Sequence, residues 1–255
     1  MHVPQLQRTL PSTLHFDRVT SICTTGTALD INELALGQPG LCAVVGSRAA
    51  GCNDLLQIAT GRQRPTLGHV TLDGQRLTAL PASVLRQRLA YGAAQVAPPR
   101  DATVRDFIED GARGPRHRFA FTLSDKQQVA RAMEAFGCRP FADAPFSSLG
   151  ANMRQRARLA RVFAQGAALS VMESPVSGLP NAAKGALLQL TRRVVIEEQR
   201  ACLMSTSNVV LACEYADRIL LMRDGLITFD GTPAALMKRS ALLRRHNTAL
   251  AKDAA

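Results

Sequence analysis

The sequence predicts an α/β fold built on a mainly parallel sheet. Three observations predict it: short apolar runs typical of buried strands, longer segments with helical apolar spacing between them, and glycine- or proline-rich turns that separate the two. A chain of 255 residues, of which 46% are hydrophobic, is also long enough to bury a core of this kind. General disorder and collagen-like repetition are therefore excluded.

The first strands lie before residue 46. The segments HFDRVTSI and LALGQPGLCAVVG predict short strands, and residues 41–45 form a continuous apolar run typical of a buried strand. This run ends at Gly46. Apolar residues at positions 55, 56, 58 and 59 then indicate a buried helix, and Asp73 with Gly74 between two alternating runs predicts a β-hairpin turn.

The middle of the chain, roughly residues 98–165, predicts a helical insert. Its first part is rich in Arg and Ala at helical spacing, and Ser124 can cap a helix that runs toward Gly137. The following helix has one apolar face and one basic face. We interpret the basic face as solvated; its arginines are Arg154, Arg156, Arg158 and Arg161.

The α/β pattern returns after this insert. Two strands and two helices are predicted, at residues 168–172, 182–198, 201–205 and 209–216 in turn. Asp224 with Gly225 predicts a second hairpin. Because strands and helices alternate, a mainly parallel sheet follows. We expect a single domain over residues 1–240 and a basic C-terminal tail over residues 241–255.

Charge and cysteine content limit the classes of partner and site. The chain has 31 Lys and Arg against 20 Asp and Glu, a formal charge of +11, which suits nucleic acid, an anionic membrane surface or simple solubility. Aromatic residues make up only 4% and there is no tryptophan, which argues against stacking platforms for single-stranded nucleic acid. The six cysteines are scattered, at positions 23, 42, 52, 138, 202 and 213, which argues against a zinc site and a disulfide scaffold.

The sequence also predicts a cytosolic location. No apolar run reaches the roughly 18 residues that a membrane-spanning helix needs. The N-terminal segment MHVPQLQRTLPSTLHFDR lacks the apolar region of a secretory signal.

One loop has the frame of a phosphate-binding loop. Such a loop is written G-x-x-x-x-G-K-[ST], where backbone amides cradle phosphates, the lysine reaches the outer phosphates and the hydroxyl binds Mg²⁺. Gly46 and Gly51 have this spacing between an apolar strand and an apolar helix, but Cys52 replaces the lysine and Asn53 the hydroxyl residue. Two glycines alone fit an ordinary strand-to-helix turn, so the loop gains meaning only from the blocks that follow.

Five blocks in unbroken order, between about residues 15 and 240, together resemble the nucleotide-binding domain of ABC transporters. Besides the loop, the blocks are GHVTLDGQRLTALPASVLRQRLAYGAAQ, SSLGANMRQRARLARVFAQ, LSVMESPVSGLP and CLMSTSNVVLACEYADRILLMRDGLITFDGTPAAL. Within the family, RLAYGAAQ, the helical insert and YADRILLMRDG are most similar to the ATPases of importers for iron chelates, haem and vitamin B12.

The resemblance implies a P-loop NTPase core, an N-terminal antiparallel β subdomain and a helical subdomain that carries the signature. It places Gln95 in the Q-loop, Glu173 and Ser174 where the family has an aspartate and a glutamate, and Ser207 where it has a histidine. The degenerate phosphate loop comprises Gly46, Ser47, Arg48, Ala49, Ala50, Gly51, Cys52, Asn53 and Asp54. The signature equivalent, in place of LSGGQ, comprises Leu149, Gly150, Ala151, Asn152 and Met153.

The resemblance implies ATP and Mg²⁺ as cofactors, with Glu173, Gln95 and Asn53 as the metal ligands. The substitutions weaken that chemistry, because phosphoryl transfer needs charge neutralisation, a metal and a positioned water. Cys52 supplies no cation, although Arg48 can swing in to compensate, and Ser174 and Ser207 supply neither the general base nor the γ-phosphate sensor. We expect weak nucleotide binding and little or no hydrolysis.

Three functional hypotheses follow. The first is the ATP-binding subunit of a membrane importer, held on the cytoplasmic face of the inner membrane by a separate permease and paired with a second ABC domain. The second is a catalytically dead pseudo-ATPase that regulates or scaffolds an assembly through protein contacts. The third, a nucleic-acid-associated ABC protein, is indicated by charge alone and is disfavoured because the chain has room for one such domain.

Overall fold

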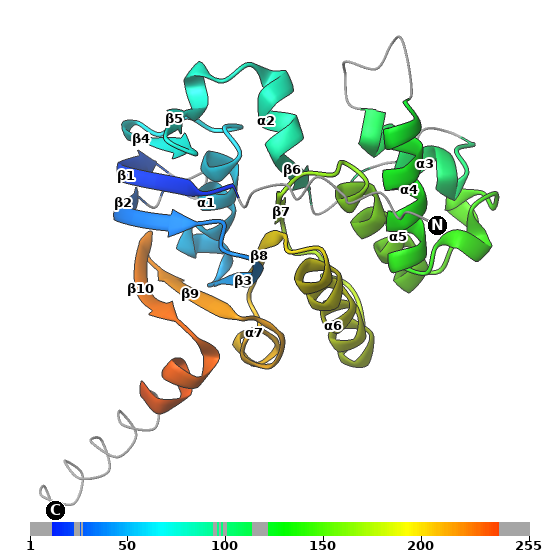
Figure 1. The fold of residues 1–255 in the computed structure, drawn as a ribbon. Coiled ribbons are helices and arrows are strands. Elements are labelled where there is room, and N and C mark those ends of the chain that lie inside the picture. Colours follow the sequence, from blue (N-terminus) through cyan, green and yellow to red (C-terminus); the bar gives the residue numbers. More distant parts are fainter. Residues whose placement is uncertain are drawn as a thin grey trace, which may run out of the picture.

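A ten-stranded mixed sheet forms the centre of the computed structural model, which describes residues 12–22, 26, 28–93, 96, 98, 101–113 and 122–239 (Figure 1). Its strand order is β5-β4-β1-β2-β10-β9-β3-β8-β7-β6. The strands are β1 (Leu14–Ile22), β2 (Ala28–Leu36), β3 (Gly40–Val45), β4 (Leu67–Leu72), β5 (Gln75–Arg76), β6 (Leu89–Gly92), β7 (Leu169–Met172), β8 (Ala201–Thr206), β9 (Arg218–Arg223) and β10 (Leu226–Gly231). The predicted α/β class is confirmed.

The sheet has an antiparallel end and a parallel end. β1 pairs antiparallel with both β2 and β4, and β4 pairs with β5 through the predicted turn, where Asp73 and Gly74 have φ values of 51° and 80°. β3 lies between β8 and β9 and is parallel to both, and β7 and β6 extend the parallel part. The carboxyl ends of β3, β6, β7 and β8 therefore lie along one edge of the sheet, where ligands bind in open α/β folds.

The helices lie on both faces of the sheet. They are α1 (Cys52–Ala59), α2 (Ala82–Arg88), α3 (Val104–Arg113), α4 (Leu123–Ala135), α5 (Ala151–Phe163), α6 (Asn181–Glu197) and α7 (Val209–Tyr215), with short 3₁₀ turns at Arg48–Ala50, Leu77–Ala79, Arg139–Phe141 and Phe146–Ser148. On β3, Leu41 and Ala43 face the core beneath α6 and α7, whereas Val44 faces the core beneath α1. This alternation lets one apolar strand serve both layers.

Helices α3, α4 and α5 pack against one another beside the sheet (Figure 1). Their shared core contains two ring pairs: Phe107 lies 4.3 Å from Phe146, and Phe136 lies 5.1 Å from Phe163, measured between ring centroids. Such tilted pairs add to the apolar area that they bury. The helical insert predicted in the middle of the chain is therefore a packed unit with its own part of the core.

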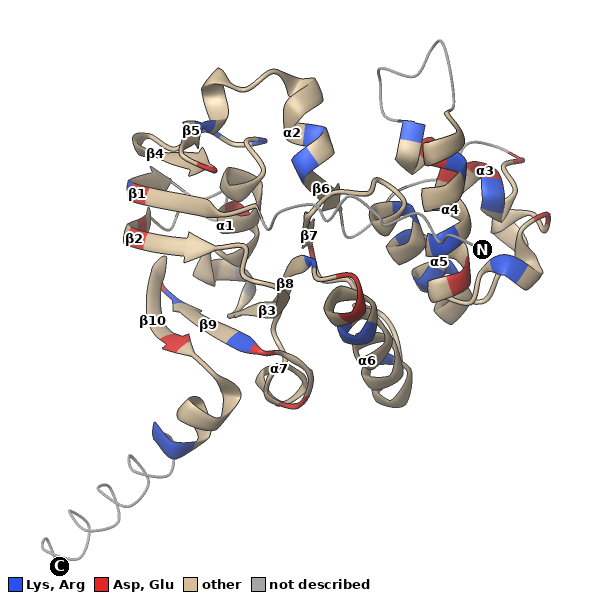
Figure 2. Cartoon of the chain, viewed as in Figure 1, with Lys and Arg blue, Asp and Glu red and all other residues tan. Residues whose placement is uncertain are grey.

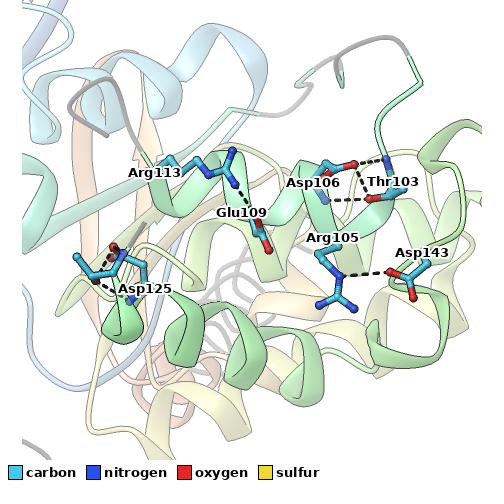
Figure 3. A network of polar contacts seen from close by, with 8 residues as sticks. Thr103, Arg105, Asp106, Glu109, Arg113, Asp125 and Asp143 are labelled. Carbon is cyan, nitrogen blue, oxygen red and sulfur yellow. Dashed lines mark hydrogen bonds and ion pairs between the residues drawn. The ribbon is translucent and has the colours of Figure 1, made fainter. Parts of the chain in front are cut away.

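Polar caps fix the starts of α3 and α4 (Figure 3), and one predicted cap was wrong. Helix α4 begins two residues earlier than expected, and Thr122 rather than Ser124 caps it. The Thr122 hydroxyl accepts from the Asp125 amide, while the Asp125 carboxylate accepts from the Thr122 amide. Thr103 and Asp106 form the same reciprocal pair on α3. Two orphan amides are satisfied at each helix start.

The basic residues are spread over α2, the helical insert, α6 and a final helical segment at residues 233–239 (Figure 2). The interpretation of Arg161 as part of a solvated face was wrong. Its guanidinium bonds the Phe107 carbonyl oxygen and Asp110, lies 4.8 Å from the Phe107 ring centroid, and ties α5 to α3. Within the described residues, no helix is long and apolar enough to cross a membrane. The predicted tail, residues 241–255, lies outside the described residues.

Candidate functional site

The candidate phosphate loop, residues 46–51, connects the end of β3 to the start of α1. The Gly46 amide donates to the Thr206 carbonyl oxygen at 3.2 Å, which fixes the loop to β8. Residues 48–50 form a single 3₁₀ turn, and Gly51 turns the chain into α1 with φ 84°, a conformation that favours glycine. The structure thus has the strand, loop and helix in the predicted order.

Gly46, at the start of the loop, is closely surrounded by other atoms of the chain. A Cβ added to Gly46 would lie 2.7 Å from the Cys52 sulfur, 2.8 Å from the Ala50 Cβ and 2.8 Å from the Met222 carbonyl oxygen. Cys52 is buried and its sulfur lies against Gly46, so the lysine position holds a small side chain packed against the loop. Asp54 is buried in the first turn of α1 and puts a carboxylate beside the same loop. The backbone of Arg48 lies in the 3₁₀ turn; its side chain lies outside the described residues.

Asn53 is joined to the ends of β7 and β8 by a short hydrogen-bond chain. The Ser205 hydroxyl donates to the Asn53 Oδ1 at 2.8 Å and accepts from the Ser174 amide at 3.0 Å. The Ser174 hydroxyl lies 3.5 Å from the Ser205 hydroxyl. Ser205 is buried at 2% exposure, and Ser174 has φ 43°, a left-handed conformation unusual for a residue other than glycine. Three elements therefore meet at one serine hydroxyl.

Glu173 turns toward a second polar group. Its Oε1 accepts from the Tyr91 hydroxyl at 2.6 Å and from the Gln57 side-chain amide at 3.2 Å, and the Arg62 guanidinium lies 4.3 Å from the Tyr91 ring centroid. Burial raises the pKa of Tyr91 above its ordinary value, and the hydrogen bond to Glu173 raises it further. Tyr91 is therefore a neutral donor at physiological pH.

The two described residues that the resemblance assigns to Mg²⁺ each use one oxygen in contacts within the chain. The Asn53 Oδ1 already accepts from Ser205, and the Glu173 Oε1 already accepts from two donors. Among the described residues, no group of three or more His, Cys, Asp or Glu side chains could hold a metal ion. Gln95, the third expected ligand, lies outside the described residues. The structure brings Asn53 and Ser174 together through Ser205 and directs Glu173 away to Tyr91.

The signature equivalent lies in the helical part of the molecule, at the start of α5. Leu149 is buried, Gly150 precedes the helix without a side-chain cap, Ala151 and Asn152 are exposed on its first turn, and Met153 is half-buried. About one turn into the helix, α5 contacts the loop after β7, since the buried Gln155 side-chain amide donates to the Pro175 carbonyl oxygen. The signature equivalent and the phosphate loop are thus held on separate elements.

Ser207 lies between β8 and α7 and is exposed. The next residue, Asn208, caps α7 by accepting from the Leu211 amide at 3.1 Å. A serine hydroxyl at Ser207 can bond a phosphate but cannot carry the charge of a protonated histidine.

Sequence reasoning missed Gln57, Tyr91 and Ser205. Gln57 follows Asn53 by four residues, so the two side chains share one face of α1, which the helical spacing alone could have indicated. Ser205 is a polar residue inside the apolar run 201–205, a second usable signal. For Tyr91 the sequence gives no signal of its contact with Glu173.

Comparison with known proteins assigns the family. The profile of the ABC transporter family matches residues 29–177. The ferric enterobactin transport ATP-binding protein FepC of Escherichia coli is 28% identical over 79% of this chain and 75% of its own length. The cobalamin import ATP-binding protein BtuD of Halobacterium salinarum is 30% identical over 82% of this chain, which spans about half, 52%, of that relative.

The fold has counterparts among solved structures. The solved structure of cbiO1 from Clostridium perfringens, part of the ABC transporter complex cbiONQ, superposes with a TM-score of 0.78 over 95% of this chain and 97% of that one, at 18% identity. At that identity the likeness concerns the fold alone. Membership of the family rests on the sequence match over residues 29–177. The chain therefore belongs to the ABC transporter family.

Proposed function

We propose that this chain is the ATP-binding-type subunit of a membrane importer for an iron chelate, haem or cobalamin, with weak or no ATP hydrolysis of its own. The observation that carries the proposal is the similarity to importer ATP-binding proteins such as FepC and BtuD, across about four fifths of the chain. The basic surface suits a chain that works beside an anionic membrane leaflet, docked on a separate permease at the cytoplasmic face.

Weak catalysis follows from the residues at the site. Phosphoryl transfer depends on cations that neutralise the phosphates and on a group that positions the attacking water. The loop offers backbone amides but no lysine, and Cys52 and Ala50 pack against Gly46. Ser174, where a glutamate would polarise the water, has its backbone amide held by Ser205. The site retains the frame of a phosphate loop without the groups that drive the reaction.

Nucleotide binding and ATP hydrolysis test the catalytic half of this proposal. We expect a fluorescent ATP analogue to bind the wild-type chain weakly and the chain to hydrolyse ATP at or near background. The variant Cys52→Lys/Asn53→Ser/Ser174→Glu should bind the analogue more tightly and gain ATPase activity. The control is Ser177→Ala, which changes an exposed serine in the segment after β7 that also contains Ser174. Rapid hydrolysis by the wild-type chain would contradict the proposal.

Transport tests the other half. In the native host, deletion of the coding sequence should reduce uptake of one of three labelled compounds: a ferric siderophore, haem or cobalamin. Complementation with the wild-type sequence should restore uptake. Unchanged uptake of all three compounds would refute the importer assignment, whatever the nucleotide measurements give.

A pseudo-ATPase that regulates or scaffolds a transporter is the second candidate. The hydrogen-bond chain from Asn53 through Ser205 to Ser174 favours it, because that chain occupies the positions from which a metal and a water would be handled. The two candidates differ in one measurement. A regulatory subunit supports uptake equally well with Ala49→Glu, which adds a carboxylate at an exposed position of the phosphate loop, whereas an ATP-binding subunit loses uptake because that carboxylate repels the phosphates.

A second ABC domain, identical or different, is the partner that this family membership leads us to propose. With an identical partner, both composite sites would lack the lysine and the signature sequence. Equilibrium sedimentation of the wild-type chain and of the triple variant, each with and without nucleotide, tests whether nucleotide promotes pairing. Nucleic acid binding is the least favoured reading, and duplex binding that resists physiological salt would contradict a phosphate-contact mechanism.

A further inference from the structure

Helix α1 is attached to the carboxyl edge of the sheet at two positions on one face. Asn53 reaches Ser205 at the end of β8, and Gln57, four residues later, reaches Glu173 at the end of β7. Residues four apart lie one above the other on a helix, so the two contacts form one polar seam along α1. The seam begins at Asn53, two residues after the end of the candidate phosphate loop.

The polar groups of the seam form hydrogen bonds with one another. A serine hydroxyl has one donor and accepts through its lone pairs, and Ser205 donates to Asn53 while it accepts from the Ser174 amide. Glu173 is half-buried and its charge is met by the Tyr91 hydroxyl and the Gln57 amide. These donors are neutral groups of the chain itself, in the place where a P-loop protein uses a metal to join its loop to the neighbouring strand.

The extra methylene of Glu173 explains why the seam has two separate parts. An aspartate at this position has a shorter reach and stays near the end of β7, whereas the longer side chain extends to Tyr91 on β6 and Gln57 on α1. Asn53 is then left to Ser205, whose hydroxyl also orients the backbone at Ser174, held at φ 43°.

We infer that this seam is a metal-free replacement for the Mg²⁺ link of the family, so that α1 and the phosphate loop are held in their folded arrangement without a divalent cation or nucleotide. The inference concerns the chain alone and does not depend on the importer assignment. It adds to the proposed function a reason why the site can lose its metal chemistry and keep its architecture.

Hydrogen exchange of the α1 amides, residues 52–59, is the direct test. In the wild-type chain we expect the same exchange rates in millimolar MgCl₂, in EDTA and in MgCl₂ with ATP. Ser205→Ala removes the central hydroxyl and should speed exchange of these amides by roughly tenfold, because two partners lose their hydrogen bond. Its melting temperature should fall by about 2–4 °C.

Ser170→Ala is the matched control. Ser170 is a fully buried serine on the neighbouring strand β7, and within the described part of the chain its hydroxyl has no hydrogen-bond partner. Removing an unpaired buried hydroxyl costs nothing or is stabilising, so this variant should exchange and melt like the wild type or slightly better. Equal effects of the two substitutions would show that the Ser205 contacts contribute nothing and would overturn the inference.

A gain-of-function variant keeps the inference testable if Ser205→Ala fails to fold. Asn53→Ser/Glu173→Asp shortens both arms of the seam and restores the oxygen ligands that suit Mg²⁺. We expect its α1 amides to exchange faster than wild type in EDTA and to slow when MgCl₂ and ATP are added together. Slower exchange of the wild-type α1 amides with MgCl₂ alone would also overturn the inference, because it would mean that the metal still completes the link.

Discussion

The hydroxyl of Tyr91 is the part of the site whose energetic contribution can be measured most cleanly. Tyr91→Phe deletes the oxygen that donates to Glu173 at 2.6 Å and leaves the ring, with Arg62 4.3 Å from its centroid, in place. A hydrogen bond to a charged group contributes about 1.5–3 kcal/mol. Because both side chains are half-buried, water can replace part of the bond, so we expect a loss near the lower limit, about 1–1.5 kcal/mol.

Urea unfolding and thermal melting measure this loss. For a domain of this size, the expected change corresponds to a melting temperature about 2–6 °C lower. The control is Tyr215→Phe, which deletes the other tyrosine hydroxyl of the chain, whose bond at 2.8 Å goes to the adjacent and exposed Glu214. Surface changes of that kind usually stay within about 0.5 kcal/mol.

The pH dependence gives a second readout of the same contact. Burial and Glu173 raise the pKa of Tyr91, so its stabilisation is complete below the ordinary tyrosine pKa and is lost as the pH rises above it. In the Tyr215→Phe background only Tyr91 titrates, and its phenolate absorbance should appear at lower pH when Glu173→Gln removes the carboxylate charge. Two results together would refute a contribution of the Tyr91–Glu173 bond. The free energy of unfolding would fall equally in Tyr91→Phe and Tyr215→Phe, and the effects of Tyr91→Phe and Glu173→Gln would simply add in the double variant.

The remaining predictions concern packing and titration. Gly46→Ala should destabilise the chain by about 1–3 kcal/mol in urea unfolding, because its methyl group meets three atoms within 2.8 Å. Phe107→Ala, at a fully buried ring, should cost about 3–5 kcal/mol and lower the helical circular dichroism first. The Thr103 hydroxyl, and next its backbone amide, lower the pKa of Asp106 by hydrogen bonding, so part of the stability should be lost as the pH falls through the acid range; Thr103→Val keeps only the amide bond and should reduce this loss. Burial raises the pKa of the Cys138 thiol to about 12, so the native protein should react slowly with a thiol reagent at neutral pH and quickly once unfolded.

Much of the fold could be predicted from the sequence because its strands are short and apolar. Residues 41–45 and 201–205 were recognised for this reason and became β3 and most of β8. Most of β2 was missed, since Asp30 and Glu33 interrupt it, although its exposed and buried residues alternate as a surface strand requires. The error at the cap of α4 had a local cause: Thr122 and Asp125 cap each other reciprocally, which Ser124 cannot do.

The candidate site was predictable in its frame but not in its contacts. The glycines of the loop and the block order could be read directly from the sequence, and the substitutions at Cys52 and Ser174 were evident there too. The direction of the Glu173 side chain could not be predicted, because it depends on Tyr91 from β6 and Gln57 from α1 meeting at one point. Sequence reasoning treated Glu173 as a longer aspartate, whereas in three dimensions the added length gives it different partners.

The position of β3 also determines the order in which the molecule can be assembled during synthesis. Its two neighbours, β8 and β9, come from the last quarter of the chain, so the ribosome completes the apolar strand long before its partners exist. The helices α3, α4 and α5 are made in between and contact one another locally, and local contacts form fastest. Nascent chains that end before β8 therefore carry a formed helical unit beside an unpaired apolar strand. Chaperones bind such strands, and premature termination leaves them free to aggregate.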